Sequence, residues 1–463
     1  MVELSSRGRT YAMFAIVTLC CAFGSLSQTS VNSMMVAIGG EFGVTSSVTQ
    51  WLTTIYMLVF GIAVPAVTWL TRTFNLRTVS FITIFIALAG SIVSFFAPSL
   101  PVLVVGRVLQ AISAGLTTPL IQTVAMTQFP KGQNATAMGV SGVALGFAPN
   151  FGPTVGGLLV ASWGWRSFFL LMIIFNACLV VATLLFIPRM EAPSRDMRLD
   201  AGSFILSSIG FGGVLLCLSN ASNFELIDPM VWVPLIVGVI GVVAFVVRQI
   251  RTERQGATPL VTMRIFESRR YRNGFVALNF LFASFLGVTL VLPLLVMELL
   301  GRPALDAGIA FLPAMVAALV FTPLAGVLCD RIGTRPVVVG GSVAMIVGAV
   351  STVVLIDDQM PLWVVGAVQC IRCAGVSCLI SPLSSWAYSL LPKQIVVDGS
   401  AFCTMVRQAC SSTGTALMMF AVTMGKAVGD IELGFRLGLG ISMVFGIVMA
   451  AIVFVRVRSS IDT

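Results

Sequence analysis

Long apolar runs, separated by short polar connections, fill almost the whole chain. Each run is roughly 20 residues long or longer, which is the length that an α-helix needs to cross the hydrocarbon core of a bilayer. The first run is long and no A-x-A-like cleavage site follows it, so we expect an uncleaved helix there and not a signal peptide. The pattern predicts an all-α integral membrane protein with about fourteen transmembrane helices. The runs occupy residues 11–38, 51–71, 78–97, 101–126, 136–161, 167–187, 201–221, 230–248, 274–299, 307–329, 336–356, 361–389, 400–424 and 436–456.

Lysine and arginine gather in every second connection between these runs. If the N-terminus is cytoplasmic, the inside connections include the segment 248–272, which alone holds seven arginines, whereas acidic residues such as Asp228 and Asp357 fall in outside connections. Positively charged connections stay on the cytoplasmic side of a membrane protein. We therefore expect a multi-pass protein of the cell inner (plasma) membrane with both termini in the cytoplasm. The excess of 27 Lys and Arg over 18 Asp and Glu follows from this topology and does not indicate nucleic-acid binding.

Composition agrees with a membrane protein and argues against several kinds of active site. Only 10% of the residues are charged, against about 25% in soluble domains. The sequence contains no histidine, which removes imidazole metal ligands and Ser-His triads. Nearly all of the ten cysteines fall within apolar runs, where free cysteine acts as a small apolar residue. No G-x-x-x-x-G-K-[ST] loop occurs, so ATP is not expected to drive the protein. We expect no enzymatic activity, no metal and no cofactor.

A stretch rich in glycine and proline interrupts the apolar run at 136–161. In lipid, small residues let helices approach closely, and neighbouring helices can satisfy the backbone groups that proline leaves free. A bent, closely packed helix of this kind suits a hinge between two bundles, although the same spacing is also typical of plain helix packing. The residues concerned are Gly142, Gly146, Pro149, Gly152, Pro153, Gly156 and Gly157.

These residues form the string G-x-x-x-G-x-x-P-x-x-G-P-x-x-G-G, which resembles the antiporter motif of major facilitator superfamily exporters. The pairs Trp165-Arg166 and Phe168-Phe169 that follow are similar to the next segment in the fourteen-helix drug:proton antiporter branch. That branch includes multidrug and lincomycin-type exporters. The resemblance extends over nearly the whole chain.

The resemblance implies the major facilitator fold, with two six-helix bundles and two extra central helices. We expect an N-terminal bundle at 1–190, two inserted helices with a basic cytoplasmic linker at 191–272, and a C-terminal bundle at 273–463. The inserted helices have no counterpart in a six-plus-six arrangement, so we expect them to make no contact with substrate.

A second motif closes the turn between two helices of the C-terminal half. It matches G-x-x-x-D-R-x-G-x-R, and the resemblance implies a cytoplasmic latch in which the acid caps a helix N-terminus and pairs with an arginine. The matching segment of the first half keeps the length but places Arg72 where the acid would be, so we expect the latch of that half to be degenerate. The alternative is that these are ordinary charged turn residues. The latch positions are Gly326, Asp330, Arg331, Gly333 and Arg335.

Three arginines fall inside apolar runs, where a charged side chain is costly and is therefore a functional candidate. Arg107 with Gln110 resembles the R-x-x-Q element of the family, whose arginine faces the central cavity and is linked to proton movement. The alternative for all three is that they only satisfy backbone carbonyl groups. Together with nearby polar residues, the expected cavity set is Gln28, Asn32, Tyr56, Arg107, Gln110, Asn279, Arg372 and Arg407.

The expected cavity lacks a carboxylate. Family members place an acid at about the position of Ser27 or Gln28, and no Asp or Glu lies in the middle of any run. Burying a cation without a partner is expensive, so we expect substrates that are neutral amphiphiles or weak acids and not quaternary cations. Proton coupling would then have to use Asp330, Glu298 or the substrate itself.

The sequence as a whole predicts a secondary active transporter, with proton-coupled multidrug or small-molecule efflux by alternating access. Its expected partners are a small-molecule substrate, protons and the lipid bilayer, and we expect a monomer that binds no nucleic acid. Two alternatives stay open. One is a proton-independent facilitator or exchanger of a neutral or anionic metabolite, and the other is a transport-inactive membrane sensor or scaffold.

Overall fold

The computed structural model describes residues 6–44, 46–129, 133–187, 200–220, 228–302 and 304–457, and within these ranges it contains helices and no strands. The helices before residue 187 are α1 (Ser6–Ser30), α2 (Met35–Phe42), α3 (Ser46–Ala63), α4 (Ala66–Thr73), α5 (Leu76–Phe95), α6 (Leu100–Thr127), α7 (Asn134–Gly142), α8 (Ala148–Trp163) and α9 (Arg166–Phe186). The later ones are α10 (Ala201–Asn220), α11 (Pro229–Arg254), α12 (Arg269–Leu294), α13 (Ala304–Ile332), α14 (Thr334–Leu355), α15 (Leu362–Tyr388), α16 (Val396–Val428) and α17 (Ile431–Arg456).

The membrane-spanning helices agree with the predicted pattern. Eleven helices of the described part are long and apolar enough to cross a bilayer, and α3 with α4, which are bent by 46° at their junction, would make a twelfth. The two other predicted spans are helical as well, since 136–161 falls on α7 and α8 with a π-helical turn (Val143–Phe147) between them and 400–424 falls within α16. The count of fourteen is therefore consistent with the structure.

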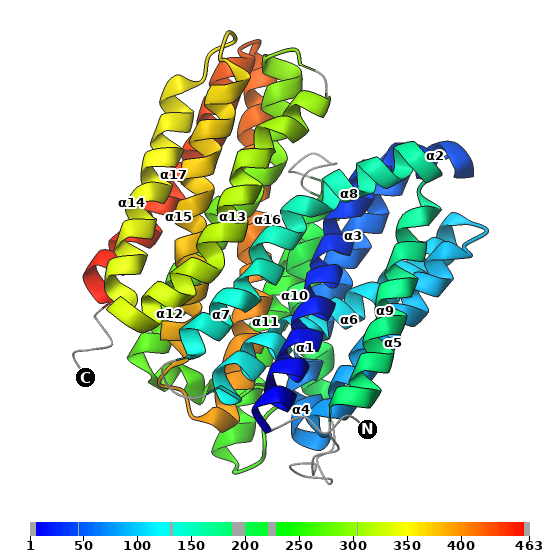
Figure 1. The fold of residues 1–463 in the computed structure, drawn as a ribbon, viewed down its shortest axis with the longest axis vertical. Helices are drawn as coiled ribbons and strands as arrows, with labels where there is room; N and C mark the ends of the chain where they lie inside the picture. The colour runs from blue at the N-terminus through cyan, green and yellow to red at the C-terminus, as the bar shows by residue number, and fades with distance from the viewer. Residues whose placement is uncertain are drawn as a thin grey trace.

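The helices stand roughly side by side in two groups (Figure 1). We call α1–α9 the first helix group and α12–α17 the second helix group. The start of α1 and the end of α17 lie toward one end of the molecule, which we call the terminal end, and the opposite end is the far end. The two groups meet toward the terminal end and diverge toward the far end. The domain boundaries near residues 190 and 272 stay a prediction.

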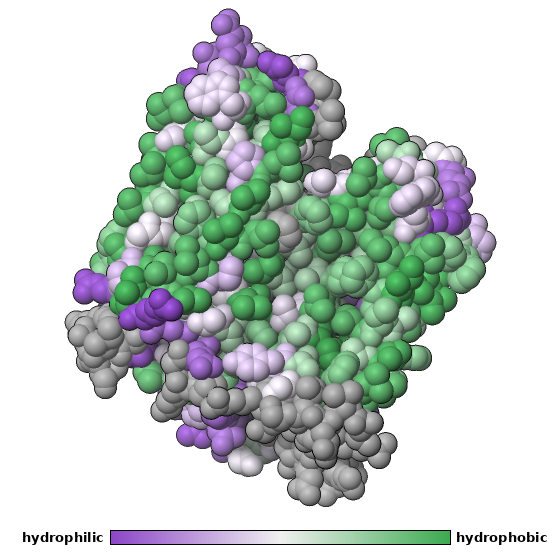
Figure 2. All heavy atoms as spheres, viewed as in Figure 1, coloured by the Kyte–Doolittle hydropathy of each residue, from purple (hydrophilic) through white to green (hydrophobic). Residues whose placement is uncertain are grey.

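The surface is apolar along the flanks and polar at the two ends. Figure 2 shows green, hydrophobic residues over the sides of both groups, and purple, hydrophilic residues at the tips and near the terminal end. Large apolar side chains that are more than half exposed, such as Val233, Ile236 and Ile240 of α11, contribute to these flanks. This distribution is the one that a bilayer requires. At the far end, Figure 2 also shows a notch between the two lobes.

Glycine permits the closest helix contacts. A Cβ atom on Gly241 of α11 would lie 2.7 Å from the Gly210 Cα atom of α10, so this pair of helices touches backbone to backbone. On α15, a Cβ atom on Gly375 would lie 2.4 Å from the Met345 backbone nitrogen of α14. Because lipid is as apolar as the side chains, such close contacts and not hydrophobic burial hold membrane helices together.

Candidate transport path and its closed end

Polar contacts join the two helix groups near the terminal end. The Tyr388 hydroxyl of α15 donates to the Gln122 side-chain oxygen of α6 at 3.3 Å. The Ser400 hydroxyl of α16 lies 3.3 Å from both the Thr123 hydroxyl and the Pro119 carbonyl oxygen of α6. These buried contacts seal α6 against α15 and α16, so the space between the groups is closed at this end.

Asp330 joins α13 to the first turn of α7. Its carboxylate accepts hydrogen bonds from the Thr136 amide at 2.7 Å, from the Thr136 hydroxyl at 2.6 Å and from the Ala135 amide at 3.3 Å. The N-terminus of a helix leaves amide groups without partners and carries partial positive charge, which favours an acid there. Asp330 therefore bridges the second helix group to the first.

The other predicted latch residues play different structural parts. Gly326 lies at the crossing of α13 with α7, where an added Cβ atom would be 2.5 Å from the Ala135 carbonyl oxygen. Gly333 precedes α14 with a φ of 89°, in the left-handed region that favours glycine. Arg331 and Arg335 are exposed. The structure thus brings Gly326 and Asp330 to the contact between the groups and leaves the two arginines at the surface.

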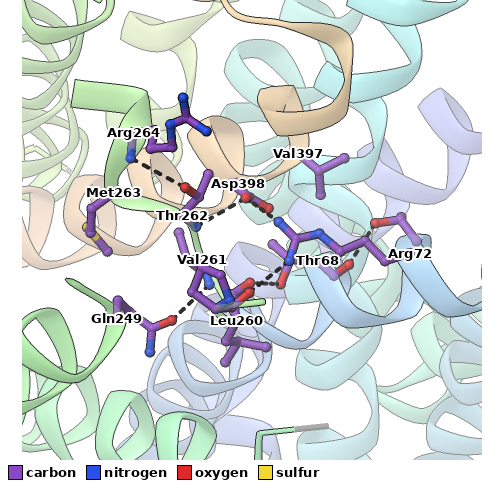
Figure 3. A network of polar contacts seen from close by, with 12 residues as sticks. Thr68, Arg72, Gln249, Leu260, Val261, Thr262, Met263, Arg264, Val397 and Asp398 are labelled. Atoms are coloured by element: carbon purple, nitrogen blue, oxygen red, sulfur yellow. Dashed lines mark hydrogen bonds and ion pairs between the residues drawn. The ribbon is translucent and has the colours of Figure 1, made fainter. Parts of the chain in front are cut away.

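The matching turn of the first helix group makes a contact that the sequence analysis did not expect. Arg72, near the end of α4, forms an ion pair with Asp398 in the first turn of α16 (Figure 3). Asp398 is fully buried and the Arg72 side chain is 20% exposed. We expected the latch of this half to be degenerate. Arg72 does stand in place of the acid of the motif, but this turn still bonds to the second helix group, because an acid is supplied from a position 326 residues away.

A segment between the inserted helices and the second helix group completes this contact. We call residues 257–262 the strap. The Arg72 guanidinium donates to the Pro259 carbonyl oxygen at 2.8 Å, and the Thr68 hydroxyl donates to the Leu260 carbonyl oxygen at 2.8 Å. The Thr262 amide donates to the Asp398 carboxylate at 3.1 Å. The strap therefore lies between α4 and α16 and bonds to both, as Figure 3 shows.

The inserted helices hold the strap from the other side. The Gln249 side-chain oxygen of α11 accepts from the Val261 amide at 3.2 Å, and the Glu253 carboxylate accepts from the Thr262 hydroxyl at 2.6 Å. Asp200, which caps α10, forms an ion pair with Arg248 of α11 at 2.9 Å. Partial burial by itself raises the pKa of the Asp200 carboxyl. Hydrogen bonds from Arg248 and Ser203 outweigh this effect and hold the pKa below its ordinary value. The inserted pair is thus a fixed support for the strap.

The glycine- and proline-rich stretch has two parts with different contacts. Its first part faces the second helix group, because a Cβ atom on Gly142 would lie 2.2 Å from the Ser381 hydroxyl of α15 and 2.6 Å from a Thr322 methyl carbon of α13. Its second part packs on α1, where Cβ atoms on Gly152 and Gly156 would lie 2.8 Å and 2.6 Å from carbonyl oxygens. The π-helical turn lies between these two parts.

The remaining glycines of the motif have more room. Cβ atoms on Gly146 and Gly157 would meet their nearest neighbours at 3.7 Å and 4.0 Å, which is ordinary contact. The Pro153 side chain lies outside the described residues. Close approach therefore requires glycine at some positions of the motif and not at others, which the spacing alone could not show.

Hydroxyl groups of α1 replace a backbone hydrogen bond that proline removes. Proline has no amide hydrogen, so Pro153 cannot donate to the Pro149 carbonyl oxygen one turn earlier. The Thr29 hydroxyl donates to that oxygen at 2.7 Å, and the Ser30 hydroxyl lies 2.9 Å from the Gly152 carbonyl oxygen. The proline-containing helix α8 is therefore stabilised from α1, within the first helix group.

We predict that Thr29→Val lowers the melting temperature of the purified protein, because the Pro149 carbonyl oxygen then has no partner. The loss should be smaller in a Pro153→Ala background, where the new amide can donate instead, with a coupling of about 1 kcal/mol. Intrinsic tryptophan fluorescence during heating gives the melting temperature in each background. Thr423→Val removes an exposed hydroxyl that bonds its own helix and serves as the control. Equal losses in the two backgrounds would contradict this account.

The buried arginines are anchored to the first helix of each group. Arg107 of α6 is fully buried and donates to the Ser27 carbonyl oxygen of α1 at 3.1 Å and to the Gln110 side-chain oxygen at 2.8 Å. Arg372 of α15 donates in the same way to the Ser284 carbonyl oxygen of α12 at 2.8 Å. The two groups thus repeat one arrangement, as an internal repeat would.

The rest of the predicted cavity set does not form one cluster. Tyr56 stacks under the Arg107 guanidinium at 4.2 Å, and Arg407 lies 4.5 Å from the centre of the Phe282 ring. The Asn279 side-chain nitrogen donates to its own helix at Phe275. Asn32 is exposed and accepts from the Thr53 hydroxyl at 3.0 Å, and Gln28 is half-buried.

Sequence reasoning missed Asp398 and the strap. Asp398 lies just before an apolar run and a few residues after Lys393. It therefore looked like an ordinary charged residue at a helix end. The signal that could have identified it is the reversed charge at Arg72, which requires an acid on a neighbouring helix. The sequence alone does not say which helix that is.

Comparisons with known proteins agree with this architecture. The family model described as Major Facilitator Superfamily matches residues 17–415. The MFS-type transporter YcnB of Bacillus subtilis is 31% identical, with 85% of this chain and 82% of that protein covered. The lincomycin resistance protein LmrB of Listeria monocytogenes is 28% identical, with 93% and 92% covered.

A solved structure of the proton:xylose symporter XylE covers 98% of this chain and 97% of that chain, with a TM-score of 0.69 and 15% sequence identity. This likeness concerns the fold alone. Together with the family match over most of the sequence, it decides the class. The chain belongs to the major facilitator superfamily, and it is a multi-pass membrane transporter with the fold of that superfamily.

Proposed function

We propose that this protein exports small molecules by alternating access and that proton movement drives the export. The observation that carries the proposal is the asymmetry of the molecule, whose two helix groups are bonded together at the terminal end and separated by a notch at the far end. A transporter that alternates between two such states exposes its substrate site to one side at a time.

Topology gives the orientation that we propose, and the names of two relatives support the direction of transport. The basic connections favour a cytoplasmic terminal end, and in that orientation the proposed state is open to the outside. The lincomycin resistance protein of Listeria and the multidrug export protein EmrB of Haemophilus influenzae, which is 24% identical, are named for resistance or export. Their names support export by this chain.

Three acids are candidates for the coupling proton. Asp330 is bonded to the first turn of α7, and Glu298, in the π-helical turn after α12, forms an ion pair with Lys426 of α16 at 2.5 Å. Asp398 differs from every other acid of the described residues because it is fully buried. A proton that binds at Asp398 would change the charge of a contact between the two groups, which gives it a direct route to the opening of the terminal end. We therefore place Asp398 first.

The test is a flux measurement with purified protein in liposomes that contain a fluorescent pH probe. We expect an imposed pH gradient to collapse faster when a transported compound is added, and Asp398→Asn to abolish this effect while compound binding persists. Glu267→Gln, which removes an exposed acid beside Arg264, is the matched control. Compound movement without proton flux would overturn proton coupling and favour a facilitator or exchanger. No flux of any compound would favour a sensor or scaffold.

A further inference from the structure

Three arginines in the interior of the helix groups have no acidic partner. Arg107, Arg372 and Arg407 are 0%, 4% and 7% exposed. The described residues form seven ion pairs, and none of them includes one of these three. The acids of the described part lie in connections or in the terminal turns of helices. Because a buried cation without an anion is expensive, the interior is suited to receive a negative charge.

A cavity lies against one of these arginines in the second helix group. Its walls come from α12, α13 and α15, and Arg372 borders it directly. The Arg372 guanidinium is held in place, since the same terminal nitrogen that bonds the Ser284 carbonyl oxygen also donates to the Ser442 hydroxyl of α17 at 2.9 Å. The lining residues that matter here are Phe285, Thr289, Phe311, Met315, Gln369 and Arg372.

Two hydrogen-bond donors border this cavity, the Arg372 guanidinium and the Gln369 side-chain amide. The Gln369 side-chain nitrogen is buried and has no hydrogen-bond partner among the described residues. Gln369 lies one helical turn from Arg372, so both side chains stand on the same face of α15. A guanidinium and an amide at this spacing match the two oxygens of a carboxylate. The remaining walls are aromatic rings and a methionine side chain, which suit an apolar body.

We propose that the cavity between α12, α13 and α15 binds the anionic head group of an amphiphilic organic acid. This inference rests on the proposed function, because it names the substrate class that the exporter carries. The cavity, of about 20 Å³, takes the carboxylate, which contacts Arg372 and Gln369. The side chains of Phe285, Phe311 and Met315 must move apart for the apolar part of the molecule to pack against them. A cationic molecule is repelled at this place. A small inorganic anion carries the same charge but makes no such contact with the aromatic rings.

The buried arginine of the first helix group supports the same inference. Two nitrogens of the Arg107 guanidinium, Nε and one terminal nitrogen, are buried without a hydrogen-bond partner among the described residues. A second cavity lies in that group, lined by its partners Ser27, Tyr56 and Gln110. Positive charge is therefore in excess in both groups, and the one buried acid among the described residues, Asp398, is already paired with Arg72 at the terminal end.

The test is equilibrium binding by calorimetry to the purified protein in detergent at pH 7.5, in a HEPES buffer that contains no carboxylate and no chloride. Three probes share one body and differ in the head group, namely 4-phenylbutanoate, 4-phenylbutanamide and 4-phenylbutylamine. We expect the acid to bind about tenfold or more tightly than the amide and the amine not to bind. Arg372→Gln should remove this preference, and an unchanged melting temperature shows that the variant is folded.

Two further variants and one anion complete the experiment. Gln369→Leu should weaken binding of the acid less than Arg372→Gln does, and Arg436→Gln, at an exposed ion pair of the same group, should change nothing. Chloride should compete only weakly. The inference is overturned if acid and amide bind equally, if the amine binds best, if Arg372→Gln keeps the preference, if chloride alone binds, or if no probe binds. The binding needs no proton gradient, so failure of proton-coupled export leaves it observable.

Discussion

Gly326→Leu is expected to trap the protein with its terminal end open. An added Cβ atom at this position would lie 2.5 Å from the Ala135 carbonyl oxygen and 3.0 Å from the Gly139 Cα atom, which are backbone atoms of α7 and cannot rotate away. Overpacking costs about 1–3 kcal/mol, which would lower the population of the closed state about 5- to 150-fold. Transport should fall in proportion.

The variant should nevertheless fold, because this crossing joins the two helix groups and lies inside neither. We expect compound-driven flux in liposomes to be nearly lost while the melting temperature changes little. Gly340→Leu on α14, where an added Cβ atom would meet nothing within 4 Å, is the matched control and should transport normally. A Gly326→Leu protein that transports at the wild-type rate would disprove the role of this crossing in closure.

Local sequence patterns predicted the helices and the overall fold of this protein well. The apolar runs were long, and the helix termini are marked by caps such as Asn75, whose side chain accepts from the Thr78 amide at 2.8 Å. The glycine motif predicted close packing, and the structure shows Gly142, Gly152 and Gly156 in contacts where a side chain would collide. Spacing in the sequence is enough to predict that a helix packs closely, because it places small residues on one face of that helix, but it does not say which helix they meet.

The partners of charged residues could not be predicted in this way. Arg72 looked like a defect in a motif, and its acid comes from the other helix group through a contact that only the folded chain brings together. The inserted helices have no counterpart in a six-plus-six arrangement, yet Gln249 and Glu253 hold the strap against that contact. Long-range pairing depends on how the groups dock, and no local pattern encodes it. The same is true of the cavity beside Arg372, whose walls come from three helices.

Asp398→Leu is expected to release the strap. Removing one partner of a buried ion pair costs about 3–5 kcal/mol, and the partial exposure of Arg72 places the effect near the lower limit. Without the carboxylate, Arg72 and the Thr262 amide both lose an acceptor. Arg264 lies two residues after the strap and its side chain is exposed. Cleavage by trypsin after Arg264 can therefore report the release of the strap. We expect this cleavage to become about tenfold to a hundredfold faster.

Exchanging the two charges tests whether the ion pair, and not packing alone, holds the strap. Arg72→Asp should release the strap as Asp398→Leu does, because two acids would then face each other, and the double variant Arg72→Asp with Asp398→Arg should recover part of the protection. Glu267→Gln leaves both partners intact and should be cut at the wild-type rate. If Asp398→Leu left the cleavage rate unchanged, the strap would be held by Gln249 and Glu253 alone. In that case the inserted helices would support a fixed loop, and the reversed charge at Arg72 would have no part in closing the terminal end.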